Sequence, residues 1–422
     1  MKKKYRQLAF SVIGIFLVVA LTGCTKEGPA GPQGPSGASS TDTLSLVGFA
    51  PGIKCTTCHN SIDTTYYVLA KEFEYSASDH ATGGDEDRNT NQCAGCHTNE
   101  GFQDRYNRGF ASETFTINAP SGPMASQTYS NSSPPGCFTC HSPHSRANFT
   151  VLDSGAVNIY TLLANQTTKQ WNSSAASNLC VKCHQPRMTS TFLTSAPYSW
   201  QPDPSKINTT DTAKIYTTRW NNHVSGEAAQ TLLGFGGFEF SGYTYSNSTH
   251  TNLVGLKSLG CEDCHMETPI SNQTGGHTFR AVGYTPSGAS AETYNNFNGC
   301  NTSYCHNGAV STSSASYWTI RNTITSELSQ LAHLMMDTNT TKKWSLPQSG
   351  KAVPWVTFTV NGTDTTWAQA NASTSKPLVV VPAAKAGALW NLQQVMYDAS
   401  MGVHNYKYTK ALLDASIAEL NK

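Results

Sequence analysis

The chain has 422 residues, of which 38% are apolar and 13% charged, with 28 basic and 27 acidic side chains. This balance excludes the basic surface of a nucleic-acid-binding protein and the acidic tail of many interaction proteins. Ser, Thr, Asn and Gly dominate long stretches, and so little apolar surface compensates poorly for chain entropy. We therefore expect the chain to organise around a non-protein group rather than around an ordinary hydrophobic interior.

The first 23 residues have the layout of an export signal. An apolar run over residues 8–21 follows four basic residues, Lys2, Lys3, Lys4 and Arg6. The run closes on Leu21-Thr22-Gly23-Cys24, which resembles the lipobox of bacterial lipoproteins and implies lipidation of Cys24. An uncleaved membrane helix is the alternative, but the run is short for a membrane span. We expect residues 1–23 to be removed, which would leave a mature lipoprotein with a net negative charge.

Residues 24–48 read as a tether between a lipid anchor and a folded body. Three Gly-Pro-x triplets begin at Gly28, and Ser and Thr follow them. The pattern is collagen-like, but three triplets can hardly hold a triple helix together. A semi-extended linker is therefore expected, on a protein of the outer membrane that faces the periplasm or the cell surface.

Twelve of the 13 cysteines form six pairs, and a histidine directly follows the second cysteine of every pair. Five pairs have the spacing Cys-x-x-Cys-His, and the sixth, Cys-Asn-Thr-Ser-Tyr-Cys-His, is two residues longer. From the first motif to the sixth, the residues are Cys55/Cys58/His59, Cys93/Cys96/His97, Cys137/Cys140/His141, Cys180/Cys183/His184, Cys261/Cys264/His265 and Cys300/Cys305/His306. Only Cys24 stands outside this pattern.

The short motif is a geometric device for attaching a porphyrin. Two thiols three residues apart reach the two vinyl groups of one haem, and the next imidazole is then placed under the iron. The competing interpretations are zinc clusters, iron–sulfur ligation and disulfides. A zinc site tolerates varied residues after its second cysteine, and a disulfide framework scatters its cysteines over distant loops. The motifs therefore predict six haem c groups, and the longer sixth motif has to bulge to keep both thiols in reach.

An electron-carrying haem usually holds its iron between two protein ligands. Seven further histidines could supply the second ligand to the six irons: His80, His144, His223, His250, His277, His333 and His404. We expect His333 to be the spare one. It falls off the apolar stripe of a predicted helix that carries Ile324, Leu328, Leu331 and Met335.

Several of these histidines lie in segments that resemble multihaem cytochromes c. The segments are Ser78-Asp79-His80-Ala81 ahead of the second motif, Cys140-His141-Ser142-Pro143-His144, Gly275-Gly276-His277-Thr278-Phe279 and Gly402-Val403-His404-Asn405. Over residues 50 to 420 the chain is most similar to the superfamily of pentahaem nitrite reductases, octahaem enzymes and their bis-histidine relatives. This resemblance implies that His80, His144, His277 and His404 are distal iron ligands and, by weaker motif matches, His223 and His250 as well.

The chain departs from the reductases of that superfamily at one decisive point. Pentahaem nitrite reductases bind their catalytic haem through a Cys-x-x-Cys-Lys motif, which does not occur here. The leading hypothesis is therefore a hexahaem electron carrier, not an enzyme, that passes electrons between redox partner proteins by hopping. One alternative is a reductase of nitrite, hydroxylamine or sulfur oxyanions with one open iron. Another is a homo-oligomer or filament in which a histidine completes a haem of the neighbouring subunit.

The expected fold is mostly α with much irregular loop and little sheet, built on a haem core over residues 49–310. Residues 311–422 are expected to add a small hairpin and helices that cover the haems or each other. The hairpin is predicted at residues 356–360 and 363–367, around an Asn-Gly turn. Two helices are predicted at residues 383–400 and 406–420, with Asn405 as a cap.

Overall fold

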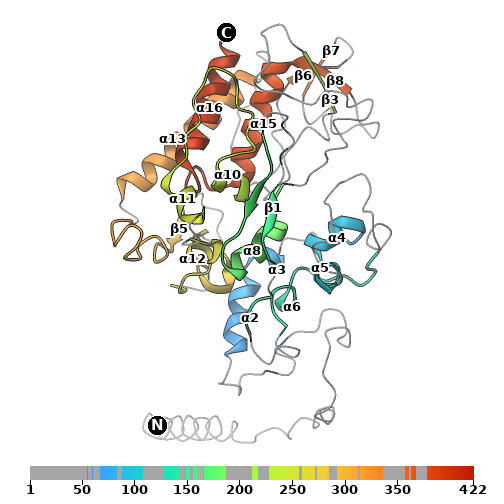
Figure 1. Ribbon diagram of the computed structural model, residues 1–422, viewed down its shortest axis with the longest axis vertical. Coiled ribbons are helices and arrows are strands. Elements are labelled where there is room, and N and C mark those ends of the chain that lie inside the picture. Colours follow the sequence, from blue (N-terminus) through green and yellow to red (C-terminus); the bar gives the residue numbers. More distant parts are fainter. Residues whose placement is uncertain are drawn as a thin grey trace, which may run out of the picture. The chain divides into compact units, whose positions relative to one another are not determined.

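The helices are short around the cysteine motifs and longer toward the C-terminus, as Figure 1 shows. In this computed structural model the described residues all lie within one unit, Leu46–Lys422. They are 55, 59, 67–82, 88–107, 128–142, 149–152, 155–159, 161, 163, 166–186, 212–216, 228–255, 259–270, 273–284, 292–311, 314–335, 357–360, 363–366 and 378–422. The predicted signal 1–23, the tether 24–48 and the site residues Cys24, Cys58, His144 and His223 lie outside them.

Within the described residues the fold is mostly helical with little sheet, as the sequence predicts. The helical elements are α2 (Val68–Ser76), α3 (Asp79–Thr82), α4 (Asn91–His97), α5 (Asn99–Asn107), α6 (Cys137–Cys140), α8 (Ala175–Cys183), α10 (Ala228–Leu233), α11 (Thr249–Gly255), α12 (Cys261–His265), the 3-10 turn η6 (Gly276–Thr278), α13 (Ala315–Met335), α15 (Ala383–Asp398) and α16 (Tyr406–Leu420). Four of them, α4, α6, α8 and α12, carry cysteine motifs.

The strands form three small antiparallel sheets. Their elements are β1 (Val157–Ile159), β2 (Lys169–Trp171), β3 (Thr212–Tyr216), β4 (Val282–Tyr284), β5 (Glu292–Asn295), β6 (Thr357–Val360), β7 (Thr363–Thr366) and β8 (Leu378–Pro382). β1 pairs with β2 and β4 with β5, while the largest sheet has the order β3-β8-β6-β7. The predicted hairpin is confirmed as β6 and β7. The sequence did not predict that β8 and β3 would extend it into a sheet.

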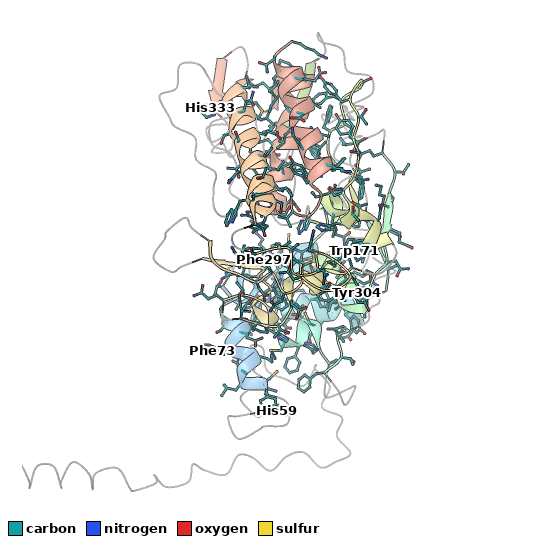
Figure 2. The ribbon with its side chains drawn as sticks, turned by 90° about the vertical axis from the view of Figure 1, so that its left-hand side faces the viewer. His59, Phe73, Trp171, Phe297, Tyr304 and His333 are labelled. Carbon is teal, nitrogen blue, oxygen red and sulfur yellow. The ribbon has the colours of Figure 1, made fainter. Side chains whose placement is uncertain are left out.

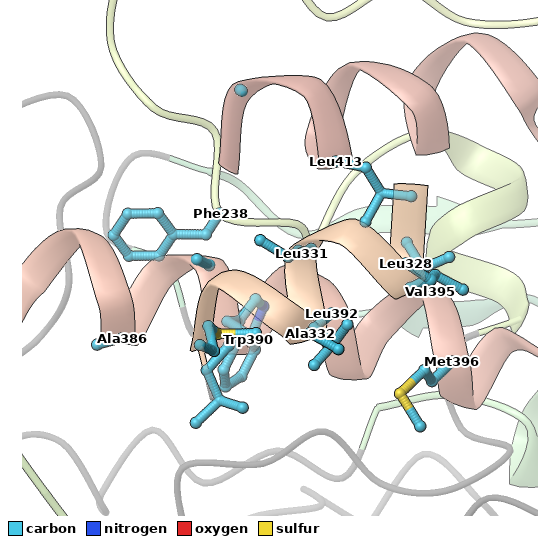
Figure 3. Packing of buried hydrophobic residues seen from close by; sticks show 14 of the residues in the cluster. Phe238, Leu328, Leu331, Ala332, Ala386, Trp390, Leu392, Val395, Met396 and Leu413 are labelled. Carbon is cyan, nitrogen blue, oxygen red and sulfur yellow. The ribbon is translucent and has the colours of Figure 1, made fainter. Parts of the chain in front are cut away.

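The three long helices α13, α15 and α16 pack against one another and enclose a hydrophobic core, part of which Figure 3 shows. The predicted stripe of α13 lies within it, because Ile324, Leu328, Leu331 and Met335 are all fully buried. The expectation that the chain builds no ordinary hydrophobic interior is therefore wrong for this part. A low overall apolar content hides the fact that apolar side chains are concentrated on these helices.

Helix α15 also holds a loop, residues 235–240, through buried polar side chains. The amide of Asn391 brackets the backbone of Phe238, accepting from its N–H at 2.6 Å and donating to its carbonyl at 2.9 Å. The indole of Trp390 donates to the carbonyl of Gly236 at 2.8 Å. A side chain at Gly387 would collide with the Phe238 ring, so the glycine allows this close approach. These bonds satisfy backbone groups that would otherwise be buried without partners.

The loop between α15 and α16 is fixed by the side chain of Asn405. As predicted, Asn405 caps α16, because its side-chain oxygen accepts from the N–H of Tyr408. The same oxygen accepts from the N–H of Ser248 at 2.9 Å, and the amide nitrogen donates to Thr251 at 3.0 Å. One buried side chain thus ties the start of α16 to α11. This connection places His404, in the loop, close to His250, on α11.

Among the helices of the described ranges, none has both the length and the apolar character required to cross a membrane.

Candidate functional site

The described cysteine motifs share a tight helical turn. In the first, third and fourth motifs, the N–H of the histidine donates to the carbonyl of the first cysteine at 2.8, 2.9 and 2.9 Å. The second and fifth motifs lie within α4 and α12. Residues three positions apart on a helix lie on the same face, so in the motifs with both cysteines described this turn sets two thiols side by side with the histidine next to them. That is the arrangement that attachment of a single porphyrin requires.

The longer sixth motif closes in the same way despite its two extra residues. The N–H of His306 donates to the carbonyl of Cys300 at 2.9 Å, as in the short motifs. The additional residues are accommodated by an outward bulge, in which Ser303, Tyr304 and Cys305 are exposed. The bulge that the sequence predicts here is confirmed.

Four motif histidines each face a histidine from a distant part of the chain. The ring centroids lie 5.9 Å apart for His184 and His80 and 6.2 Å apart for His141 and His277. They lie 6.1 Å apart for His265 and His404 and 6.2 Å apart for His306 and His250. In every pair one member follows a cysteine motif and the other is a predicted distal ligand.

This recurring separation fits an iron between two imidazoles. An imidazole nitrogen binds a transition metal at about 2.0 Å, so two rings on opposite sides of one metal have centroids about 6.3 Å apart. Direct ring packing has no reason to repeat one distance in four unrelated pairs, whose interplanar angles range from 37° to 85°. The histidines therefore fit a haem with two axial imidazoles.

Three of these rings have an acceptor at Nδ1, which leaves Nε2 for a metal. Nδ1 of His265 lies 3.0 Å from the carbonyl of Phe279, and Nδ1 of His250 lies 3.0 Å from the carbonyl of Val403. Nδ1 of His404 instead donates to a carboxylate oxygen of Asp398 at 2.6 Å. Metal-bound histidines usually donate their second ring nitrogen in this way, which fixes the ring and raises its basicity.

A second carboxylate lies beside His277. An oxygen of Glu74 on α2 accepts from the backbone N–H of His277 at 3.0 Å and lies 3.6 Å from its Nδ1. The ring nitrogen is thus beyond a direct hydrogen bond but within the field of the charge. Lys71, which pairs with Glu74 at 3.0 Å, offsets part of that field.

Burial keeps most of the paired imidazoles in the neutral form that binds metals. It lowers the pKa of His80 to about 4, with help from His184, and that of His265 to about 4, with help from His404. Burial also lowers the pKa values of His141 and of other members of the pairs. For His404 burial acts in the same direction, but the charge and hydrogen bond of Asp398 outweigh it and the pKa is raised.

The described part of the chain gives no evidence for the other sites that cysteine and histidine can form, namely disulfides and metal clusters. None of the cysteines described is joined in a disulfide, and no three or more His, Cys, Asp or Glu side chains there converge on one point as a metal cluster would require. A haem iron needs only two protein ligands, because the porphyrin supplies the other four. Burial also raises the pKa of the Cys140 thiol to about 12, so that it is protonated.

The chain matches no family model, no curated protein and no solved structure. The similarity to multihaem cytochromes rests on the motifs alone.

The remaining predicted histidines differ in their placement. His333 lies on the exposed side of α13, where Figure 2 shows it, and its Nδ1 is 2.6 Å from the carbonyl of Ser329 on its own helix. For the irons expected at His59 and His97, the predicted distal ligands left over are His144 and His223, which are outside the described residues.

Sequence reasoning missed three residues of the site. Asp398 and Glu74 each approach a distal histidine, and Phe279 joins three pairs at once. The Phe279 ring lies 4.8 Å from that of His80 and 5.9 Å from that of His277, while its carbonyl faces His265. No local pattern could have revealed them, because their roles depend on residues from elsewhere in the chain.

Proposed function

We propose that this protein is an exported hexahaem c-type cytochrome that carries electrons through haems with two axial histidines. The observation that carries the proposal is the repeated pairing of a motif histidine with a distant histidine at 5.9 to 6.2 Å. When bound, haem supplies a one-electron couple between ferric and ferrous iron. Two protein ligands on each iron leave no position for a substrate, which favours electron transfer over catalysis at the described pairs.

The chain's own side chains would perform three tasks. Cysteine pairs on short helical turns hold each porphyrin, and paired histidines fix its iron. Carbonyl and carboxylate groups on Nδ1 hold the rings in orientation, so little has to move when the charge of the iron changes. Helices and loops around the pairs limit access of water, which sets the potential together with nearby charges.

The proposed location is the outer membrane, through lipidation of Cys24 and the tether that follows it. This part of the proposal rests on the order of basic residues, apolar run and Leu-Thr-Gly-Cys ending in the sequence. The partners are then redox proteins or acceptors on the same side of the membrane. Labelling of wild-type and Cys24→Ser chains with a radioactive fatty acid tests it, and label on both or neither would contradict it.

Low-temperature electron paramagnetic resonance of the oxidised protein separates a carrier from an enzyme. Imidazole planes near perpendicular leave two iron d orbitals almost degenerate and give highly anisotropic low-spin signals, while smaller angles give rhombic ones. The pairs His250/His306 and His80/His184, at 85° and 71°, predict the first kind. The pair His141/His277, at 37°, predicts a rhombic signal.

The signals of parallel samples with added nitrite or hydroxylamine should be unchanged. A high-spin signal that shifts with either compound would make the protein an enzyme with an open iron.

A further inference from the structure

The six motifs do not contact one another in the order in which they occur along the chain. The first motif lies against the third, because the Cys137 thiol is close enough to the Cys55 thiol to raise its pKa. Helix α2, which follows the first motif, makes a second link, because the hydroxyl of Tyr75 donates to the carbonyl of Pro135 just before the third motif. The second motif is therefore skipped at this point.

The second, third and fourth motifs meet at one place. The hydroxyl of Thr139, within the third motif, donates at 2.9 Å to Asn99, two residues beyond the second. The buried guanidinium of Arg105 donates to Cys96 in the second motif at 3.5 Å and to the carbonyl of Lys182 in the fourth at 3.4 Å. Cys140 and Cys183, from the third and fourth motifs, pack against one small apolar cluster of Phe102, Leu152 and Leu179.

From the fourth motif the contacts continue to the fifth and then to the sixth. Ser177 on α8 donates to the Cys261 thiol at 3.2 Å and accepts from the Cys261 N–H at 2.9 Å. Gly299, directly before the sixth motif, lies so close to the fifth that an added Cβ would be 2.1 Å from the carbonyl oxygen of Asp263. The contact order is thus first, third, fourth, fifth and sixth, with the second attached beside the third and fourth.

The distal histidines support the same order. Phe279 touches His80 and His277 and accepts from His265, so the pairs of the third, fourth and fifth motifs share one residue. Val403, which accepts from His250, is the neighbour of His404, so the pairs of the fifth and sixth motifs share one loop. Because a thioether places the porphyrin edge next to its cysteine, motifs in contact bring their haem edges within a short distance of each other.

The sixth motif differs from the other described motifs in its exposure. Residues 303–309 are all exposed, and Tyr304, labelled in Figure 2, retains 94% of its accessible surface. Among the described residues of the other motifs only Asp263 is exposed, and the rest are half-buried or buried. Among the contacts between motifs described above, the sixth motif is reached only from the fifth. It therefore combines a terminal position with access to solvent.

We propose that the haem of Cys300 and Cys305 is the site at which electrons cross between this chain and an external one-electron partner whose redox centre stays outside the protein surface. This inference rests on the proposed function. One electron passes from ferrous iron to the oxidised partner, no bond forms or breaks, and no proton is required. Apart from His306, the residues of the exposed segment are uncharged. We therefore expect these residues not to steer a charged partner toward the site.

The test blocks the proposed site without touching a ligand. Ala309→Cys places a thiol on the exposed segment, and Asn107→Cys places one on the exposed end of α5 beside the second motif. The native cysteines are expected to be occupied by haem or lipid, so a bulky maleimide polymer reacts only at the new thiol. Each labelled, fully reduced protein is mixed in a stopped-flow instrument with ferrocenium linked to dextran, which is too large to reach a recessed haem. Free ferrocenium serves as the control oxidant.

The label at position 309 should slow oxidation by the dextran-linked reagent by roughly tenfold or more, because it blocks productive encounters. The label at position 107 should change that rate by less than about twofold, and free ferrocenium should oxidise both proteins at similar rates. Equal rates for the two labelled proteins with the dextran-linked reagent would overturn the inference. Haem is counted in the same samples, and a chain without covalent haem would overturn the proposed function instead.

Discussion

Replacing Asp398 with asparagine should raise the reduction potential of the haem held by His265 and His404. The carboxylate is buried, with a side chain only 1% exposed, and its oxygen lies 2.6 Å from Nδ1 of His404. A negative charge there favours ferric over ferrous iron, because the ferric state carries one more positive charge. Asparagine keeps the shape and the oxygen acceptor but removes the charge.

The geometry gives the size of this effect. With an imidazole–metal bond of about 2.0 Å, the iron lies about 6.5 Å from the carboxylate oxygen. At an effective dielectric constant of about 20, a unit charge at that distance is worth about 2.5 kcal/mol. For a one-electron couple, about 59 mV corresponds to a tenfold change in the equilibrium constant, so the midpoint should rise by roughly 100 mV.

A potentiometric titration followed by electron paramagnetic resonance measures the shift for the individual low-spin signals. Asp414→Asn is the matched control, since Asp414 is an exposed carboxylate on α16 that pairs with Lys410. One signal should move upward in Asp398→Asn, and none should move appreciably in the control. A shift no larger than that of the control, or a downward one, would refute the reasoning.

Three further predictions concern other parts of the fold. Glu74→Gln should raise one haem potential by less than Asp398→Asn does, because the Glu74 carboxylate is farther from the histidine ring and is paired with a lysine. The same potentiometric titration measures this shift, and a shift equal to or larger than that of Asp398→Asn would contradict the prediction. His250→Ala should open one iron and produce a high-spin signal in electron paramagnetic resonance, whereas His333→Ala should leave every signal low-spin. A high-spin signal in His333→Ala would show that His333 is an iron ligand. Leu328→Ala, at a fully buried position, should lower the free energy of unfolding by about 2–5 kcal/mol. Leu334→Ala is the control, and because that position is 38% exposed it should lower the free energy of unfolding by about 0.5 kcal/mol or less. Urea titrations followed by circular dichroism measure the difference, and equal losses would show that this core does not stabilise the chain.

Local signals made the helical parts of the fold predictable. The cysteine motifs specify their own turn, because residues three and four positions apart meet on a helix. The caps and apolar periodicity of the last two helices gave their positions to within two residues, with α15 ending at Asp398 rather than at residue 400. The β3-β8 pairing could not be read in this way. It joins strands more than 150 positions apart that carry no mutual signal.

The pairing of histidines was beyond the reach of sequence reasoning for a similar reason. The sequence supplies seven candidates, but nothing near His250 indicates that it faces His306 rather than another motif. The choice is made by long-range contacts, such as those of Asn405 with α11 and of Phe279 with three histidines. The roles of the Asp398 and Glu74 carboxylates could not be predicted either, because only the folded chain brings them close to a histidine ring nitrogen.

The most direct test of six covalently bound haems is the intact mass of the exported protein under denaturing conditions, together with its visible absorption. Covalent attachment of haem and lipid predicts the mass of the mature polypeptide plus six haems and the lipid on Cys24, a haem c absorption spectrum that survives denaturation, and no reactive thiol. A mass equal to that of the polypeptide alone, with thiols that react freely, would contradict it.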